Sequence, residues 1–137
     1  MSKKNNLLTV GIEHYKPELD AQKIVWQERS ESHHEIILVH SDDKGNQNIQ
    51  FRIVIPKNLS TGTYDLADDK FNKSNVIHRS MAGNFEIRGY SGTLTITTLN
   101  FNTPIFVGSF NAKASVEAFP YKLTYECVRF EATKYVA

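Results

Sequence analysis

The strongest constraint on the fold is a two-residue alternation of apolar and polar side chains through residues 105–119. Successive side chains of a β-strand point to opposite faces, so the pattern predicts one long strand with a buried face and an exposed face. The apolar face would carry Phe106, Gly108, Phe110, Ala112, Ala114, Val116 and Ala118. We therefore expect Phe110 to be almost fully buried and Lys113, on the opposite face, to be exposed.

Shorter segments with similar alternation, or with a continuous apolar run, recur along most of the chain. They predict further strands in residues 7–12, 23–29, 35–40, 48–56, 63–66, 75–78, 83–100 and 121–136. The segments 35–40 and 48–56 flank a turn signal, which predicts an antiparallel hairpin. We therefore expect residues 1–137 to form a single all-β domain, an antiparallel β-sandwich or a flattened β-barrel with about eight to ten strands.

The apolar face changes sides within residues 83–100. Phe85 and Ile87 are odd-numbered, whereas Tyr90, Leu94 and Ile96 are even-numbered, and Gly89 and Gly92 lie at the change. One extra residue reverses the facing of all later side chains, so we favour a β-bulge or bend with a glycine at positive φ. The alternative is a tight turn that divides the segment into two short strands.

A second change of face occurs near Cys127. Leu123, Tyr125 and Cys127 are odd-numbered, whereas Val128, Phe130 and Ala132 are even-numbered. The same reasoning predicts a second β-bulge there. Two bent long strands suit a strongly curved sandwich or a partly closed barrel.

Composition and charge argue against several classes of partner. The 137 residues carry a net charge of +1 without a basic run, which disfavours nucleic acid and anionic membranes. The N-terminal residues do not resemble a secretory signal, and no segment approaches the roughly 20 apolar residues that cross a bilayer. A single cysteine cannot form an internal disulfide framework. We therefore expect a cytoplasmic protein.

Three framework motifs, "GTYDL" (62–66), "YSGTLTITTLN" (90–100) and "IFVGSFNAKA" (105–114), carry a resemblance to a known group. They are similar to G-x-Y-x-L, S-G-x-(L/I)-x-I and G-(T/S)-F-x-(F/A)-x-A in uncharacterised bacterial all-β domains, many of them lipid-anchored at the cell surface. The resemblance covers about the C-terminal half and implies an all-β fold but no activity. This chain differs in having no lipoprotein leader.

Histidines are the first candidate metal ligands. The nearest to one another in sequence, with their acidic neighbours, are Glu31, His33, His34, Glu35 and His40. Adjacent strand residues point to opposite faces, whereas a zinc site needs three or four converging ligands, so we expect a solvated connector and no metal. His14 and His78 could still join one of these residues in space.

The remaining polar motifs suggest no catalysis or cofactor. The acidic pairs Asp42–Asp43 and Asp68–Asp69 lack the spacing of a calcium loop, so turn roles are expected. Ser91 in "GYSG" lacks the spacing and the following helix of a nucleophile elbow. Cys127 lies among apolar neighbours, which predicts a buried, inert thiol. We therefore predict no catalytic residue, no metal and no cofactor.

Phe71 and Phe101 lie in polar segments and are the candidate partner-binding residues. Core packing is one interpretation of both, but exposed loop aromatics suit protein or ligand contact. We predict a non-enzymatic binding module that contacts a protein partner, or a second copy in a homodimer, through residues 67–80 and 99–104. The alternative is a lipocalin-like small-molecule carrier with a cavity between the sheets, and an enzyme comes third.

Overall fold

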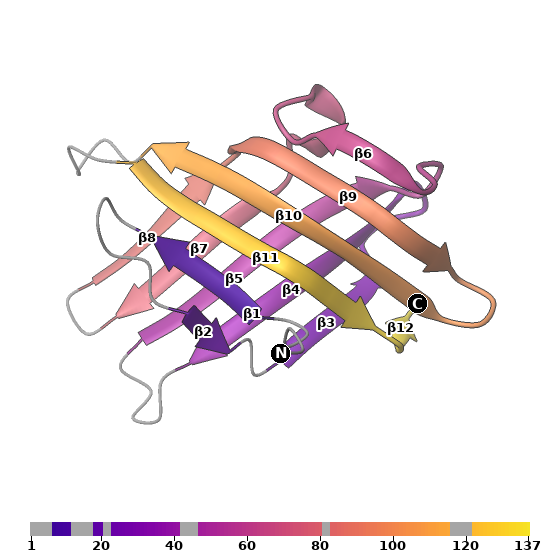
Figure 1. Cartoon of the computed structure of the whole chain (residues 1–137), viewed down its shortest axis with the longest axis horizontal. Helices are drawn as coiled ribbons and strands as arrows, with labels where there is room; N and C mark the ends of the chain where they lie inside the picture. The colour runs from indigo at the N-terminus through magenta and orange to yellow at the C-terminus, as the bar shows by residue number, and fades with distance from the viewer. Residues whose placement is uncertain (1–6, 12–17, 21–22, 42–46, 81–82, 116–121) are drawn as a thin grey trace.

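The computed structural model describes residues 7–11, 18–20, 23–41, 47–80, 83–115 and 122–137. Within these residues, twelve strands form two six-stranded sheets that pack face to face (Figure 1). The described ladders are antiparallel except for the one between β12 and β3, and they do not close either sheet into a barrel. The predicted antiparallel β-sandwich is therefore confirmed, with more strands than expected.

Sheet 1, which contains the orange and yellow strands in Figure 1, has the order β2–β1–β11–β10–β9–β6. Its strands are β1 (Leu7–Gly11), β2 (Glu18–Asp20), β6 (Gly62–Asp65), β9 (Ser91–Asn100), β10 (Ile105–Ser115) and β11 (Lys122–Ala132). Sheet 2 has the order β12–β3–β4–β5–β7–β8. Its strands are β3 (Lys23–Glu28), β4 (His33–Ser41), β5 (Gln47–Pro56), β7 (Asn75–Ser80), β8 (Gly83–Arg88) and β12 (Tyr135–Val136). A short 3-10 helix, η1 (Asp69–Phe71), lies between β6 and β7.

Aromatic rings fill the core between the two sheets. Phe51 of β5 stacks on Phe110 of β10, with ring centroids 4.5 Å apart and an interplanar angle of 7°. Phe106 and Phe130 meet edge to face at 5.0 Å. Phe110 is 3% exposed and Lys113 is exposed, so the alternation in β10 has the predicted facing. Burial of each such ring contributes roughly 1.5–3 kcal/mol of hydrophobic free energy.

The change of face within residues 83–100 marks a crossing between the sheets. β8 ends at Arg88 in sheet 2, and β9 begins at Ser91 in sheet 1. The favoured prediction of a bulged continuous strand is wrong. The alternative is correct in dividing the segment into two strands, but β9 is ten residues long and lies in the other sheet. Gly89 has a φ of 83° at the crossing, a backbone conformation that glycine adopts without a Cβ clash.

Gly92 serves a different purpose, because it brings two backbones together. Its φ is 137°, and a Cβ atom there would lie 2.0 Å from the carbonyl oxygen of Asn111 and 2.8 Å from Cα of Ala112. Only glycine therefore permits the observed approach of β9 to β10. The prediction of a glycine at positive φ is confirmed, and both Gly89 and Gly92 have one.

The bulge predicted near Cys127 is present in β11. Gly108 pairs with Phe130, whereas Phe110 pairs with Cys127, so β11 carries one residue more than β10 between these pairs. Cys127 and Phe130 are both buried, so the inward face changes parity across this bulge, and the predicted bulge is confirmed. The inward facing predicted for Val128 is wrong, because its side chain is 41% exposed and the face changes only after it.

A further register shift in β9 was not predicted. Val107 pairs with Thr98, but Gly108 pairs with Ile96, which leaves Thr97 as an extra residue. After this residue, the odd-numbered Leu99 packs against the core. The polar "TTLN" sequence obscures the change of face, because two adjacent threonines fit either face.

Candidate functional site

One end of the sandwich, which we call the loop end, gathers several connections beside the C-terminus (Figure 1). Its connections are residues 29–32, 57–61 and 101–104. The backbone N–H of Lys57 donates to the carbonyl of Ser32 at 2.9 Å, which joins the first two connections. Phe101 packs against Trp26 of β3 at 5.4 Å between ring centroids, which joins the third. The connections therefore form one surface.

A depression of about 540 Å³ lies on this surface. It is lined by Ser32, His33, Pro56, Lys57, Asn58, Leu59 and Lys70. Pro56 and the half-buried Leu59 supply apolar area, and Leu59 packs against the main core. The lining also contains cations and hydrogen-bonding side chains, so the depression offers both apolar and polar contacts to a ligand.

An ion pair occupies one side of the depression. Nζ of Lys57 contacts a carboxylate oxygen of Glu28 from β3. This hydrogen bond raises the pKa of Lys57 above its ordinary value. The charge of Lys57 is therefore balanced locally, whereas Lys70 is an exposed cation on η1.

Beneath the loop end lies a group of rings that we call the Trp26 cluster: Trp26, His34, Phe101, Phe106 and Tyr135. The ring of Trp26 lies 4.8 Å from that of Tyr135, and the ring of His34 lies 5.0 Å from that of Phe101. The cluster thus joins β3, β4, β10, β12 and the connection between β9 and β10. Such ring pairs add roughly 0.5–1.5 kcal/mol each beyond their buried area.

His34 is fully buried within the Trp26 cluster. Its Nδ1 accepts a 2.8 Å hydrogen bond from the indole N–H of Trp26. Burial, followed by the nearby positive charge of Lys57 and by His33, lowers the pKa of His34 to about 4. The ring is therefore neutral at pH 7 and cannot act as a cationic binding group there.

The structure changes the interpretation of the adjacent histidines. His33 lies at the rim of the depression, where its Nδ1 is 2.7 Å from Oγ of Ser32. The prediction of a solvated connector is wrong for His34, because the two rings point to opposite faces of β4. Within the described segments, no three His, Cys, Asp or Glu side chains come together as a metal site would require. His14, Asp42 and Asp43 lie outside the described residues.

The two predicted partner-binding aromatics are not exposed rings. Phe71 is 1% exposed and belongs to the main core, so its predicted exposure is wrong. The short helix η1, capped by the Asp68 carboxylate that accepts from the Lys70 N–H, directs this ring inward. Phe101 is half-buried and packs against the core. Its use as a contact residue stays a prediction.

The two residues considered as nucleophiles, Cys127 and Ser91, both lie on strands of sheet 1. Cys127 is buried, as predicted, and burial raises the pKa of its thiol to about 12, so little thiolate exists at pH 7. Ser91 is exposed at the start of β9, where its Oγ donates to the carbonyl of Lys113 at 3.4 Å. Its only described hydrogen bond is therefore to the neighbouring strand.

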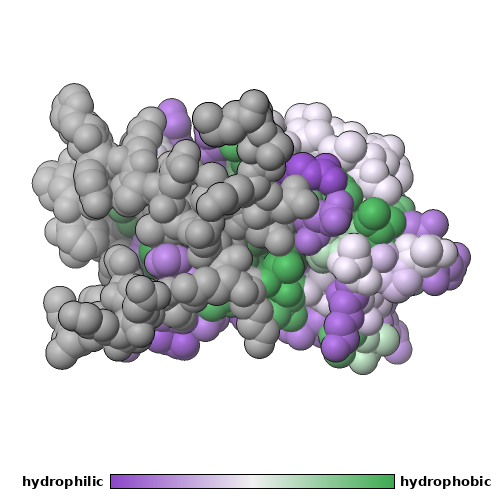
Figure 2. Space-filling view, turned by 60° about the horizontal axis from the view of Figure 1, so that its bottom comes forward, coloured by the Kyte–Doolittle hydropathy of each residue, from purple (hydrophilic) through white to green (hydrophobic). Residues whose placement is uncertain are grey.

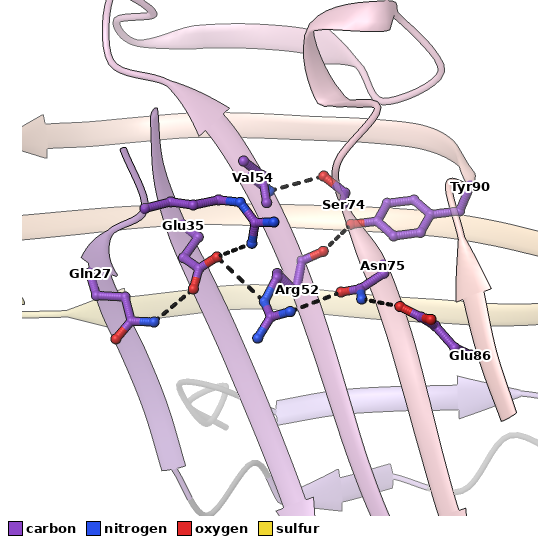
Figure 3. Close-up of polar contacts among 9 residues, drawn as sticks. Gln27, Glu35, Arg52, Val54, Ser74, Asn75, Glu86 and Tyr90 are labelled. Atoms are coloured by element: carbon purple, nitrogen blue, oxygen red, sulfur yellow. Dashed lines mark hydrogen bonds and ion pairs between the residues drawn. The ribbon is translucent and has the colours of Figure 1, made fainter. Parts of the chain in front are cut away.

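A buried carboxylate lies on the outer face of sheet 2 (Figure 3). Glu35 is 3% exposed and accepts hydrogen bonds from Gln27 at 2.7 Å and from Arg29 at 2.9 Å. Nε of Arg52 lies 3.4 Å from the same oxygen that Arg29 contacts. Both carboxylate oxygens are thus engaged, and we assign Glu35 a role in holding three strands together.

The polar contacts continue across sheet 2 as far as β8 (Figure 3). Asn75 accepts from Arg52 at 3.5 Å and donates to Glu86 at 2.6 Å. The hydrogen bonds from Asn75 and Arg88 lower the pKa of Glu86. This row of charges keeps the outer face polar, which suits a solvated sheet.

Hydrogen bonds also anchor the chain where it leaves sheet 2. Ser74 accepts from the backbone N–H of Val54 at 2.9 Å, beyond the last β5–β7 pair. The hydroxyl of Tyr90 donates to the carbonyl of Arg52 at 2.7 Å (Figure 3). Burial raises the pKa of Tyr90, which therefore stays protonated. Both contacts are structural.

One polar pair bridges the two sheets away from the loop end. Nε2 of His78 lies 2.6 Å from the hydroxyl of Tyr125. Burial lowers the pKa of His78 to about 4 and raises the pKa of Tyr125. A neutral imidazole and a neutral phenol therefore hold β7 against β11. The two residues are 47 positions apart, so the sequence pattern did not predict this contact.

A second, smaller hollow of about 290 Å³ lies on the outer face of sheet 1, beside the bulge in β11. It is lined by Thr93, Thr95, Ser109, Phe110, Asn111, Glu126, Cys127 and Val128. The hydroxyl of Thr93 donates to Asn111 at 3.2 Å, so part of the lining is already paired. The hollow offers little apolar area besides Val128.

The described surface has little exposed apolar area. Among the described residues, the exposed large hydrophobic side chains are Val128 (41%) and Val136 (48%). On the coloured part of Figure 2, green apolar areas are small and separated by polar ones. Surfaces of this kind do not drive association through a large hydrophobic patch. The described segments also contain no helix of the length and hydropathy that would span a membrane.

Comparison with protein-family models, with curated proteins and with solved structures finds no match to this chain. The resemblance to bacterial all-β domains therefore stays a prediction.

The Trp26–His34 pair escaped sequence reasoning, although a signal for it existed. Residues 23–29 and 35–40 were predicted as strands, and the connector between them is short. In the antiparallel hairpin of β3 and β4, Glu28 pairs with His34 and Trp26 pairs with Ile36, so Trp26 and His34 are diagonal neighbours on one face. The sequence pattern predicted the two strands but not the register in which they pair.

Proposed function

We propose that the chain is a non-enzymatic binding module that contacts a protein partner through the loop end. The observation that carries this proposal is the depression of about 540 Å³, which is lined by residues 32–33 and 56–59 at that end and by Lys70 of η1. Its lining comes from connections joined by hydrogen bonds and supported by the Trp26 cluster. A rigid β scaffold commonly carries its binding contacts on such connections.

The lining favours an extended polypeptide with an acidic residue. Leu59 and Pro56 would contact an apolar side chain, and the exposed cation of Lys70 would attract a carboxylate. Asn58 is exposed and offers both a donor and an acceptor for a peptide group. The interface would be small, so we expect a transient complex.

The runner-up function, a lipocalin-like carrier, receives less support. The described rings of Phe51, Phe110, Phe106 and Phe130 occupy the space between the sheets in which a large ligand would lie. An enzymatic function has no described constellation to support it. A homodimer is compatible with the proposal if the partner is a second copy.

Site-specific photo-crosslinking in cells tests the proposal. A benzophenone amino acid would replace Asn58, at the depression, or Asn111, an equally exposed asparagine on the outer face of sheet 1. We expect a discrete crosslinked protein from position 58 and none from position 111. The same product from both positions, or one from position 111 alone, would contradict the proposed surface. Light scattering of the purified chain distinguishes a homodimer from a different partner.

A further inference from the structure

Two buried polar atoms in the Trp26 cluster have no hydrogen-bond partner within the described part of the chain. They are Nε2 of His34 and the hydroxyl oxygen of Tyr135. Buried polar groups are nearly always paired, because an unpaired group loses its hydration without compensation. Two such atoms around one ring cluster therefore call for an explanation.

The protonation state of His34 follows from its other nitrogen. Nδ1 accepts from the indole N–H of Trp26, so the proton of the neutral imidazole is on Nε2. Nε2 is therefore a donor without an acceptor. The Tyr135 hydroxyl can donate or accept. In donor and acceptor character, the two groups are complementary to a ligand that carries a carbonyl oxygen and an N–H.

The ring of Phe101 lies against both residues. Its centroid is 5.0 Å from that of His34, 5.1 Å from that of Tyr135 and 5.4 Å from that of Trp26. One apolar ring thus packs against both rings that carry the unpaired groups, and it has no polar atom to pair with either group. Phe101 is half-buried and begins the connection between β9 and β10, whose turn is held by the Asn100 side chain.

We propose that the slot occupied by the Phe101 ring is a binding site for a small, neutral aromatic amide. In the bound state the Phe101 ring leaves the slot, and the ligand ring packs against Trp26. The ligand carbonyl accepts from Nε2 of His34, and its N–H donates to the Tyr135 hydroxyl. A neutral ligand is favoured over an anion because Lys57, a cation that acts on His34, is already paired with Glu28. This inference does not depend on the proposed protein partner.

Trp26 is the only tryptophan in the chain, so its fluorescence reports occupancy directly. The probes are benzamide, benzoate and toluene, which share one ring but differ in the attached group. We expect benzamide to bind the wild-type chain weakly and to bind Phe101→Ala at least ten times more tightly, because no ring must leave. Toluene and benzoate should bind Phe101→Ala at least ten times more weakly than benzamide.

A second, milder variant of the slot keeps the test decisive if Phe101→Ala does not fold. Tyr135→Phe removes only the unpaired hydroxyl, and Tyr64→Phe is the control, because the Tyr64 hydroxyl donates to the Ser60 carbonyl elsewhere. Benzamide affinity should fall at least fivefold in Tyr135→Phe and stay unchanged in Tyr64→Phe. Equal affinity for toluene and benzamide, tighter binding of benzoate, or no fluorescence change with benzamide would each overturn the proposal.

Discussion

The indole N–H of Trp26 donates a 2.8 Å hydrogen bond to Nδ1 of His34, across the hairpin of β3 and β4 and inside the core. This contact sets the tautomer of the histidine and fixes the floor of the loop end. It also explains why a histidine is tolerated at a fully buried position, since one ring nitrogen is paired and the ring is neutral.

Replacing Trp26 by phenylalanine should destabilise the chain strongly. The variant loses buried volume and leaves Nδ1 of His34 without a donor, which together should cost about 2–4 kcal/mol in the free energy of unfolding. Urea titration measures the change. The comparison variant Tyr64→Phe removes a hydrogen bond at an exposed position and should cost less than about 1 kcal/mol. A loss below that of the comparison variant would contradict the role of the pair.

Stability should fall between pH 6.5 and pH 4 because of His34. The unfolded chain binds a proton on this histidine near pH 6.5, whereas the folded chain binds it near pH 4. Between these values the unfolded state holds more protons, so acid favours unfolding and stability rises with pH. The full difference is about 3 kcal/mol, present above pH 6.5 and lost by about pH 4. His78 adds a change of the same sign.

The variant His34→Asn isolates this contribution. Its amide oxygen can accept from Trp26 but cannot be protonated, so the pH dependence of unfolding between pH 6.5 and 4 should become shallower. Urea midpoints at a series of pH values measure the slope, independently of any constant loss of stability. If the urea midpoints of the wild type and of His34→Asn changed equally with pH, the pKa of His34 would be the same in the folded and unfolded chains.

Local pattern predicted much of the fold. The strict alternation in residues 105–115 gave the facing of Phe110 and Lys113, and the change of parity gave the bulge after Cys127. The pattern could not show whether the strand bulges or ends at Gly89. A bulge and a crossing between sheets both change which of the odd- and even-numbered residues face the core. That choice depends on which strands pair with β8 and β9, and pairing is a non-local property.

The site was less predictable than the fold. Phe71 lies in a segment without periodicity, so no pattern indicated that a single turn of 3-10 helix directs it into the core. The Trp26 cluster combines residues from β3, β4, β10, β12 and a connection, which only the packing of the two sheets brings together. Pairs separated widely in sequence, such as His78 and Tyr125, leave no signal in a single chain.

Gly92 should tolerate substitution much less well than Gly89. A Cβ atom at position 92 would overlap the backbone of Asn111, whereas position 89 has nothing within 4 Å. We expect Gly92→Ala to lose more than about 3 kcal/mol, because two backbones must separate, and Gly89→Ala to lose about 1 kcal/mol from its positive φ. Denaturant midpoints of the two variants measure this, and the reverse order would show that the β9–β10 contact is wrong.

Serine substitutions should separate the two phenylalanines that the sequence grouped together. Phe71→Ser places a hydroxyl in the core and should cost at least about 3 kcal/mol, comparable with loss of a buried ring. Phe101→Ser, at a half-buried position, should cost about 1–2 kcal/mol. Thermal unfolding followed by circular dichroism gives the ranking. Equal and small losses would restore the interpretation of two exposed rings.

The most direct test of the organisation of the loop end is the pH titration of Trp26 fluorescence. A protonated imidazole quenches an adjacent indole, so emission reports the charge of His34 in the folded chain. Far-UV circular dichroism, recorded in parallel, identifies the pH range in which the sandwich stays folded. We expect constant emission from pH 8 to about pH 5 and quenching centred at about pH 4, absent in His34→Asn. Quenching centred near pH 6.5 in the folded protein would show that His34 is not the buried, neutral histidine described above.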